Sequence, residues 1–448
     1  MTFSHDEPGT LAASWTEHPR WPGLAALDLD LGAFDRLVVL AAHPDDESLG
    51  AGGLIARAHR HGLAVVVVAA TDGEGSHPGS PTHSRDELAA VRRTEVRDAV
   101  RALAPTATTH SWGLPDGALS DRADELLAAL VRLVGDGRRT LLVAPWRHDG
   151  HTDHEAAGRA AATAAVRTGA RLLEYPIWWW HWGRPDRAPW DRLRVLDLDE
   201  AESAARARAQ AAHRSQTEPL SDQAGAEVLL SASFLQHFAG PRETYVVEPA
   251  EDTALDDLHA RVSDPWGTDS RWYELRKRSL LLAALPRPTF RHGLEIGSST
   301  GALAADLASR CQQLLVVDSS AEAVTTARAR LQGIDTVRVE QLTVPREWPA
   351  PPAGGFDLVV LSEVGYFLSP ADLDRLVERL RTDLADDGVV VLCHWRHPIV
   401  GWPLDGAAVH TVLTSAGLRP VVADYRDRDL ELLVLADPAE LPDPEAET

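Results

Sequence analysis

A short loop in the first half of the chain combines one imidazole with two adjacent carboxylates, those of His43, Asp45 and Asp46. The loop follows residues 37–40, an apolar run with the composition of a β-strand. Open α/β sheets carry their reactive side chains just beyond the carboxyl ends of such strands. These residue types could bind a divalent metal ion and leave one carboxylate as a base. The aspartates could also cap a helix, so the loop alone leaves both interpretations open.

A second cluster later in the chain favours the metal interpretation. His148, His151 and His154 lie within seven residues, directly after the apolar run 140–145. His151 and His154 are spaced i, i+3 at the start of an alanine-rich stretch, so on a helix their side chains can face the same way. Isolated histidines are more often structural. Three of them after a buried strand, in a region that already carries the first cluster, indicate metal binding or catalysis.

The elements that must position these clusters form an alternation of strands and helices. Residues 63–70 and 140–145 are continuous apolar runs of strand length, as expected where both faces of a parallel sheet are covered. Helices are expected over 86–104, ended by Pro105, and over 121–134. This alternation predicts an α/β fold, a doubly wound sheet between two layers of helices.

Short motifs around both clusters resemble the LmbE-like, or PIG-L, family of zinc-dependent N-acetylglucosamine deacetylases. The resemblance covers residues 36–248. The matching motifs are AHPDDE (42–47), TDGE (71–74), RRTE (92–95), GLPDG (113–117), GHTDH (150–154) and HRSQ (213–216). It implies a Rossmann-like three-layer domain and an amino-sugar substrate.

By this resemblance His43, Asp46 and His154 would be the metal ligands, and Asp45 would be the general base. Two histidines and one carboxylate leave a coordination position open for water, as in catalytic zinc sites. The metal would lower the pKa of that water and polarise the amide carbonyl, while the neighbouring carboxylate takes up the proton. The resemblance therefore implies Zn²⁺, or another divalent metal, as a cofactor.

The same resemblance gives roles to four further residues. His151 would stabilise the oxyanion or protonate the leaving amine, and Asp153 would orient a histidine. Arg92 and Asp116 match positions that contact sugar hydroxyls. The stretch 175–182 contains four tryptophans. It could be a wall on which a sugar ring stacks, or it could be core packing.

The second half of the chain contains a separate glycine-rich pattern. A strand is expected over 291–296, followed by a loop with Gly297 and Gly301; a second strand over 313–317 ends at Asp318. Glycines let the backbone approach a ligand, and an acid at the end of the second strand can bind ribose hydroxyls. The pattern predicts a nucleoside-binding βαβ unit.

This pattern looks like motif I of class I S-adenosylmethionine-dependent methyltransferases, with their seven-stranded sheet. Three longer stretches resemble nodulation-type (NodS-like) N-methyltransferases, which act on chitooligosaccharide amines: DPWGTDSRWYELRK (264–277), SEVGYFL (362–368) and HWRHPIVGWPLDGAAVH (394–410). The residues that would bind S-adenosylmethionine are Glu295, Gly297, Gly301, Asp318 and Ser319. One departure is Gln341, which stands where the family usually has an acid near the adenine.

Three residues of this half could orient or deprotonate an amine: Glu363, Tyr366 and His394. Methyl transfer to an amine depends mainly on placing the nitrogen in line with the sulfonium methyl group. Each of the three could instead be a packing or hydrogen-bonding residue.

The 448 residues predict two or three domains. We expect an N-terminal extension (1–33), a deacetylase domain (34–249), a linker (250–263), a methyltransferase domain (264–437) and an acidic, disordered tail (438–448). The sequence does not predict an oligomeric state.

Composition narrows the class of partner. Lys and Arg number 44 against 67 Asp and Glu, a net charge of −23, which disfavours nucleic acid. No apolar run approaches the length of a membrane span, and Cys311 and Cys393 are typical of reduced thiols. We therefore expect a cytoplasmic protein with a small-molecule substrate, no nucleic acid and no membrane.

Together the two resemblances predict a bifunctional enzyme. One half would hydrolyse an N-acetyl group on an amino-sugar-containing molecule, and the other would methylate an amine, so that the two could act in series. Two alternatives stay open. The first half could be an amidase for a thiol–sugar conjugate beside an unrelated methyltransferase, or the second half could be only a binding or scaffold module.

Overall fold

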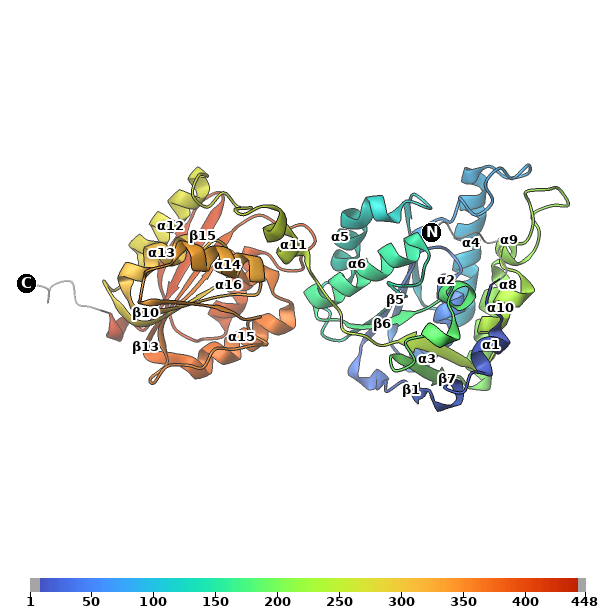
Figure 1. The fold of residues 1–448 in the computed structure, drawn as a ribbon, viewed down its shortest axis with the longest axis horizontal. Helices are drawn as coiled ribbons and strands as arrows, with labels where there is room; N and C mark the ends of the chain where they lie inside the picture. Colours follow the sequence, from blue (N-terminus) through green and yellow to red (C-terminus); the bar gives the residue numbers. More distant parts are fainter. Residues whose placement is uncertain (1–8, 442–448) are drawn as a thin grey trace, which may run out of the picture. The chain divides into compact units, whose positions relative to one another are not determined.

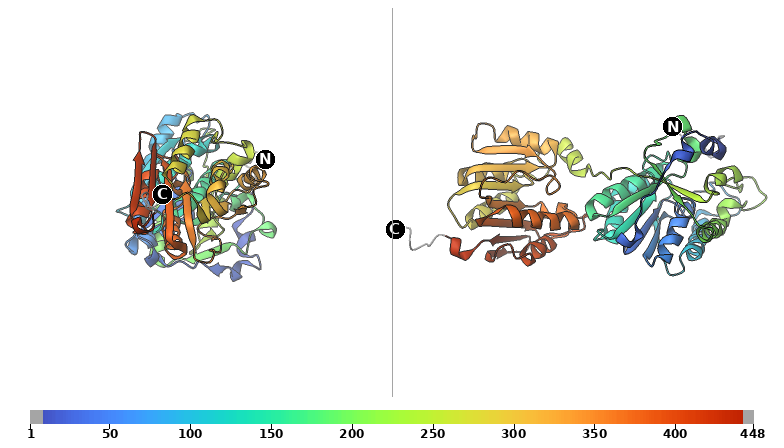
Figure 2. Two further views of the ribbon diagram at one scale, coloured as in Figure 1. Left: turned by 90° about the vertical axis from the view of Figure 1, so that its left-hand side faces the viewer. Right: turned by 90° about the horizontal axis from the view of Figure 1, so that it is seen from below.

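The structure, a computed structural model, describes residues 9–441 (Figure 1). It contains two compact units, residues 1–251 and 252–448. Most of the predicted acidic tail, residues 442–448, lies outside the described residues. Each unit is a β-sheet with helices on both faces (Figure 2), so the predicted α/β class is confirmed.

The sheet of the first unit has the strand order β1-β7-β8-β6-β5-β2-β3-β4. Its strands are β1 (Ala25–Ala26), β2 (Arg36–Ala41), β3 (Ala64–Thr71), β4 (Thr108–Leu114), β5 (Thr140–Pro145), β6 (Arg171–Tyr175), β7 (Leu193–Asp197) and β8 (Arg242–Val246). The stretch from β6 to β4 is parallel. Strand β8 is antiparallel to both of its neighbours.

Both faces of this sheet are buried. Side chains along a strand alternate between the faces, so Leu37 and Val39 belong to one core cluster, and Val38 and Leu40 belong to another. The main helices are α3 (Gly52–Arg60), α4 (Arg85–Leu103) and α8 (Glu200–Ala212) over the first cluster, and α5 (Ala123–Val134) and α6 (Thr152–Thr168) over the second. The shorter helices are α1 (Ala12–Thr16), α2 (Asp46–Gly50), α7 (Trp179–Trp182), α9 (Arg214–Thr217) and α10 (Ala232–Leu235).

The second unit has a seven-stranded sheet of order β11-β10-β9-β12-β13-β15-β14, in which only β15 runs antiparallel to its neighbours. The strands are β9 (Phe290–Ile296), β10 (Cys311–Asp318), β11 (Val337–Gln341), β12 (Phe356–Ser362), β13 (Leu384–Trp395), β14 (Val421–Arg426) and β15 (Leu430–Leu435). The helices are α11 (Ala254–Arg261), α12 (Trp272–Ala284), α13 (Ala302–Leu307), α14 (Ala321–Arg330), α15 (Pro370–Asp383) and α16 (Gly406–Ser415). Helix α11 lies inside the stretch predicted as a linker.

Candidate functional site

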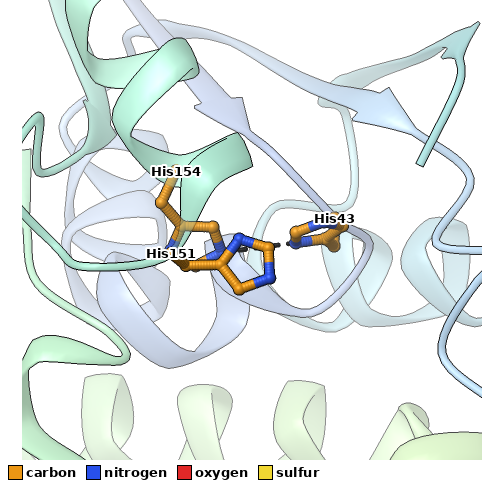
Figure 3. Close-up of side chains that lie close together, drawn as sticks. All are labelled: His43, His151 and His154. Atoms are coloured by element: carbon orange, nitrogen blue, oxygen red, sulfur yellow. Dashed lines mark hydrogen bonds between the residues drawn. The ribbon is translucent and has the colours of Figure 1, made fainter. Parts of the chain in front are cut away.

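The sheet topology of the first unit brings the two predicted clusters together. Strands β2 and β5 are parallel neighbours, so the loops that follow them open at the same edge of the sheet. His43 follows β2, and His154 lies in the first turn of α6, which follows β5. Asp46 begins α2. Residues far apart in sequence therefore share one buried site (Figure 3).

Four potential ligand atoms from three residues converge in this site. His43 Nδ1 lies 3.3 Å from His154 Nε2, His154 Nε2 lies 3.3 Å from Asp46 Oδ1, and His43 Nδ1 lies 3.8 Å from Asp46 Oδ2 (Figure 3 shows the histidines). Tetrahedral zinc with ligands at about 2.0–2.1 Å requires donors spaced by about 3.4 Å. The observed spacing fits a divalent metal ion.

The outward-facing nitrogen of each histidine meets a carboxylate. His154 Nδ1 lies 2.8 Å from Asp149 Oδ2, and His43 Nε2 lies 3.1 Å from Asp116 Oδ1 and 3.3 Å from Asp153 Oδ2. Metal-binding histidines commonly donate their second N–H to such groups, which fixes the tautomer and turns the other nitrogen toward the metal. Asp116, expected to contact a sugar, is therefore also a partner of His43.

Two further groups of side chains could also hold a metal ion, His43 with His151 and His154, and His43 with Asp116 and Asp153. Asp153 is already engaged, since it accepts the backbone N–H groups of Gly117 and Leu119 at 2.8 and 3.1 Å. Burial opposes the ionisation of Asp116, but its bond to His43 holds the Asp116 pKa below the ordinary value. Asp116 and Asp153 therefore hold the His43 ring at Nε2, while its Nδ1 faces His154.

Asp45 lies beside the three donors in a constrained loop. Its backbone has φ = 139°, outside the region that L-residues usually adopt, and its N–H donates to Glu47 Oε2 at 3.1 Å. Arg92 Nη2 donates to Asp45 Oδ2 at 3.0 Å and also to the carbonyl oxygen of Pro44. Burial raises the pKa of Asp45 to about 6, against the opposing effect of Arg92. Arg92 is buried and holds the loop that carries the predicted base.

His151 is the N-cap of α6, and its tautomer follows from that position. Its Nδ1 accepts the backbone N–H of Asp153 at 3.3 Å. The proton of a neutral ring must therefore be on Nε2. The ring centroid lies 5.0 Å from that of His43 and 4.7 Å from that of His154 (Figure 3). His151 can thus present an N–H donor beside the metal-binding atoms.

In the second unit, Gly297 and Gly301 form a left-handed loop between β9 and α13, with φ of +80° and +75°. A Cβ atom at Gly297 would lie 2.6 Å from Val364 Cγ2. The Asp318 carboxylate accepts the backbone N–H groups of Ser299 and Ser320 at 2.8 and 3.0 Å. The loop is thereby tied to the end of β10.

Polar atoms around this loop lack partners among the residues that the structure describes, namely Glu295 Oε2, Ser298 Oγ and Ser299 Oγ. Burial, followed by the charge of Asp318, raises the pKa of Glu295 to about 8. Ser319, also predicted to bind the cofactor, is exposed. Binding of S-adenosylmethionine by these residues stays a prediction.

Two family patterns match the chain. Residues 38–165 match GlcNAc-PI de-N-acetylase (PIG-L), and residues 248–422 match nodulation protein S (NodS). The chain joins a PIG-L domain to a NodS domain. Within residues 9–441, no helix is long and apolar enough to cross a membrane.

Relatives of both domains are known. A 1D-myo-inositol 2-acetamido-2-deoxy-α-D-glucopyranoside deacetylase of Rhodococcus erythropolis is 30% identical over 176 residues, covering 32% of this chain and 60% of the relative. Nodulation protein S of Azorhizobium caulinodans is 30% identical over 139 residues, covering 30% and 64%. The chain thus spans less than two thirds of the length of these relatives.

A solved structure is also similar to the second half of the chain. N-methyltransferase NodS from Bradyrhizobium japonicum, in complex with S-adenosyl-L-homocysteine, is 22% identical with a TM-score of 0.37. The match covers 42% of this chain and 100% of that one.

The PIG-L domain has a cavity of about 330 Å³ over the donor atoms, within the usual range for small-molecule sites. The predicted residues His43, Asp45, Asp46, His151, Arg92 and Asp116 line it, together with Leu49, Gly75, Ser76, Pro78, Arg85, Gly117, Thr152, Ile177, Trp178, Leu229 and Leu230. Of the tryptophan stretch, Trp178 lines this cavity. Trp179 and Trp180 instead pack against Trp15, so core packing holds for these two, and the stacking of a sugar ring on Trp178 stays a prediction.

In the NodS domain, His394 is fully buried. Its Nε2 accepts the backbone N–H of Gly365 at 3.1 Å, and its Nδ1 lies 2.9 Å from His410 Nε2. Burial, and then the charge of His410, lowers the pKa of His394 well below its ordinary value. His394 therefore supports the Glu363–Tyr366 loop, and its ring is closed off from any substrate by these contacts.

Asp149 is the residue of the PIG-L site that the sequence analysis missed. Its Oδ2 lies 2.8 Å from His154 Nδ1, and its carboxylate accepts three backbone N–H groups, those of Ile177, Trp178 and Trp179. Its position two residues before His151 was the signal that could have found it.

Replacing Asp149 with asparagine is expected to weaken zinc binding by about 30-fold, because the amide no longer fixes the His154 tautomer. Competition with a chromogenic chelator measures the affinity. Asp136→Asn is the control, since Asp136 is exposed and its carboxylate accepts hydrogen bonds from the backbone and side chain of Arg138. Wild-type zinc affinity in D149N would contradict this role.

Proposed function

We propose that the chain is a bifunctional enzyme. The PIG-L domain hydrolyses the N-acetyl amide of an amino sugar, and the NodS domain methylates an amine with S-adenosylmethionine. The convergence of His43, Asp46 and His154, with Asp45 beside them, is the observation that carries the first activity. The two buried, unpaired cysteines support a reducing compartment, and we place the protein in the cytoplasm.

Zn²⁺ is the metal that this donor set fits best, with His43, Asp46 and His154 as ligands. The ion would supply a water of lowered pKa and polarise the substrate carbonyl. The donors are two imidazoles and one carboxylate, without a thiolate, as in catalytic zinc sites that keep one position open.

The chain's own residues supply the proton transfers. Asp45 takes the proton of the attacking water at Oδ1, since Arg92 occupies Oδ2. The His151 Nε2–H donates to the carbonyl oxygen as negative charge develops there. The water oxygen bonds to the acyl carbon, the C–N bond breaks with its electron pair going to nitrogen, and the nitrogen takes up a proton. The products are acetate and a free amine.

In the NodS domain the Gly297–Gly301 loop and Asp318 hold S-adenosylmethionine. The close backbone approach at Gly297 and the unpaired polar atoms nearby support this placement. The substrate amine forms a bond to the methyl carbon as the S–C bond breaks, and its electron pair stays on sulfur. The methylated ammonium then gives one proton to water.

The order of the two reactions follows from their chemistry. An amide nitrogen is a poor nucleophile because its lone pair is delocalised, and hydrolysis converts it into the amine that methylation needs. The test supplies N-acetylglucosamine and N,N′-diacetylchitobiose with and without S-adenosylmethionine, and mass spectrometry follows the products. We expect free amine without the methyl donor and methylamine with it. Serial action fails if no amine forms, or if the amine that forms is never methylated.

Removal of the metal should separate the two activities. A chelator is expected to stop deacetylation, and added zinc should restore it. The groups that could hold a metal among residues 9–441 lie in the PIG-L domain. Methylation of supplied glucosamine should continue at its original rate, which serves as the internal control. Loss of both activities with the chelator would contradict a metal role confined to one domain.

A further inference from the structure

Lys277 is the only lysine among the chain's 44 basic residues, and all the others are arginine. It lies on α12, and only 5% of its surface is exposed. A buried ammonium is costly unless it is paired. The chain uses arginine at every other basic position and keeps lysine at this buried one. The contacts of the Lys277 ammonium can therefore explain why lysine is present here.

Two carboxylates surround the Lys277 ammonium. Its Nζ lies 2.8 Å from Glu274 Oε2 and 3.3 Å from Glu363 Oε1. A lysine ammonium is compact and has three donors that can point to separate acceptors, whereas arginine presents a wide planar fork. The site therefore suits lysine and not arginine.

Glu363 has a strained backbone, with φ = 58°, and follows β12 beside the cofactor loop. The next residue, Val364, is the one that packs against Gly297. Strained backbone that the surrounding structure maintains is characteristic of functional sites. The carboxylate of Glu363 is therefore held beside the place where methyl transfer is proposed.

The Glu363 carboxylate accepts four donors, which fills its lone-pair positions. Besides Lys277, these are the hydroxyl of Tyr273 at 2.6 Å, the hydroxyl of Tyr366, and the backbone N–H of Trp395 at 2.9 Å. Glu363 thus has little capacity left for a substrate. Both tyrosine protons point to Glu363, so each phenol oxygen keeps lone pairs as acceptors for another donor.

Both tyrosines stay protonated in this arrangement. Burial, and then the charge of Glu363, raises the pKa of Tyr273 and of Tyr366. A primary amine offers two N–H donors and one lone pair. Two phenol oxygens that accept those N–H bonds would leave the lone pair for the methyl group, which is the alignment that the transfer needs.

We propose that Lys277 is a positioning residue for methyl transfer: it holds the Glu363 side chain in place, Glu363 orients the Tyr273 and Tyr366 hydroxyls, and their oxygens accept the N–H bonds of a primary amine. This inference rests on the proposed methyltransferase activity and specifies its substrate as a primary amine. The nitrogen bonds to the methyl carbon, the electron pair of the broken S–C bond remains on sulfur, and the product ammonium releases one proton to water. The resulting secondary amine has one N–H fewer, so a second methylation is slower.

The first test compares Lys277→Met with Arg276→Met, its neighbour on the same helix. In the described part of the chain, Arg276 hydrogen-bonds Tyr425 and Asp427, and not Glu363, Tyr273 or Tyr366. With S-adenosylmethionine and glucosamine, K277M is expected to lower kcat by about 30-fold. The S-adenosylmethionine affinity, measured by calorimetry, should change by less than about twofold, because the cofactor loop is untouched. R276M should keep wild-type kcat.

Two further variants test the tyrosine pair, whether or not K277M folds. Tyr273→Phe removes one acceptor oxygen at almost constant volume, and Tyr425→Phe is its control. Glu363→Gln replaces one carboxylate oxygen, which accepts one of the two hydroxyls, with an amide donor. Both site variants should lower kcat. Y273F should also raise the ratio of dimethylated to monomethylated product, because a monomethylated amine has only one N–H and is slowed less than a primary amine when one acceptor oxygen is removed. A merely structural role would leave that ratio unchanged.

The outcomes separate this inference from the activity on which it rests. A wild-type chain that methylates neither glucosamine nor chitobiose-derived amine contradicts the methyltransferase proposal itself. A wild-type chain that methylates these amines, with folded K277M, Y273F and E363Q all retaining its kcat and product ratio, overturns the positioning role alone. Should K277M fail to fold, Y273F and E363Q decide the question by the same criteria.

Discussion

Asp45→Asn is expected to slow N-acetyl hydrolysis by about 10³-fold while the protein still binds zinc, because positioned general bases contribute about 10²–10⁴-fold. The amide has the size of the carboxylate and can still accept the Arg92 hydrogen bond. It cannot take up the proton of the attacking water. Rates with N-acetylglucosamine, read together with zinc content by mass spectrometry, measure the two properties in one preparation.

The adjacent aspartate gives the matched comparison. Asp46→Ala removes a donor atom that lies 3.3 Å from His154 Nε2, so both zinc binding and hydrolysis should be lost. Methylation of supplied glucosamine by the second domain reports whether each variant chain is intact. Wild-type hydrolysis by D45N would show that another group is the base.

Much of the fold was predictable because its signals are local. Helix α4 is capped by Ser84, whose side chain accepts the N–H of Glu87 while the Glu87 side chain accepts the N–H of Ser84, a capping box whose residues are visible in the sequence. The central strands are continuous apolar runs, as predicted. The two-residue strand β1 and the antiparallel strand β8 were not predictable in the same way. Their positions depend on pairing with β7, and neither carries a periodic pattern of its own.

The site residues were likewise predictable where the signal is local and not where it depends on distant contacts. His43 and His154 were identifiable because each lies in a loop dense in ligand-type residues. Lys277 and Tyr273 were not singled out as site residues, because on α12 they look like ordinary helix residues, and their role depends on Glu363, a residue of another element. Contacts between elements far apart in sequence leave no local spacing pattern, so the geometry was needed to find them.

Gly297→Ala is expected to weaken S-adenosylmethionine binding by about 100-fold, from the combined cost of left-handed backbone and overpacking. Gly297 has φ = +80°, and its added Cβ would lie 2.6 Å from Val364 Cγ2 and 2.7 Å from Val364 Cβ. The loop that would hold the cofactor must therefore shift. Calorimetric titration with S-adenosylmethionine measures the effect, and zinc-dependent hydrolysis by the first domain should be unchanged.

A control in the same domain separates the cost of left-handed backbone from the contact between the added Cβ and Val364. Gly333 has φ = +86°, and a Cβ there would meet nothing within 4 Å, so Gly333→Ala carries the backbone cost without touching the cofactor loop. G333A should lower the melting temperature slightly and leave cofactor binding at the wild-type level. Val364→Gly removes the atoms that G297A would strike, so the double variant should recover part of the lost affinity, a non-additive result expected only of residues in contact. Equal losses of affinity in G297A and G333A would instead show that the effect reflects domain stability, and the glycine loop would lose its assignment as the cofactor site.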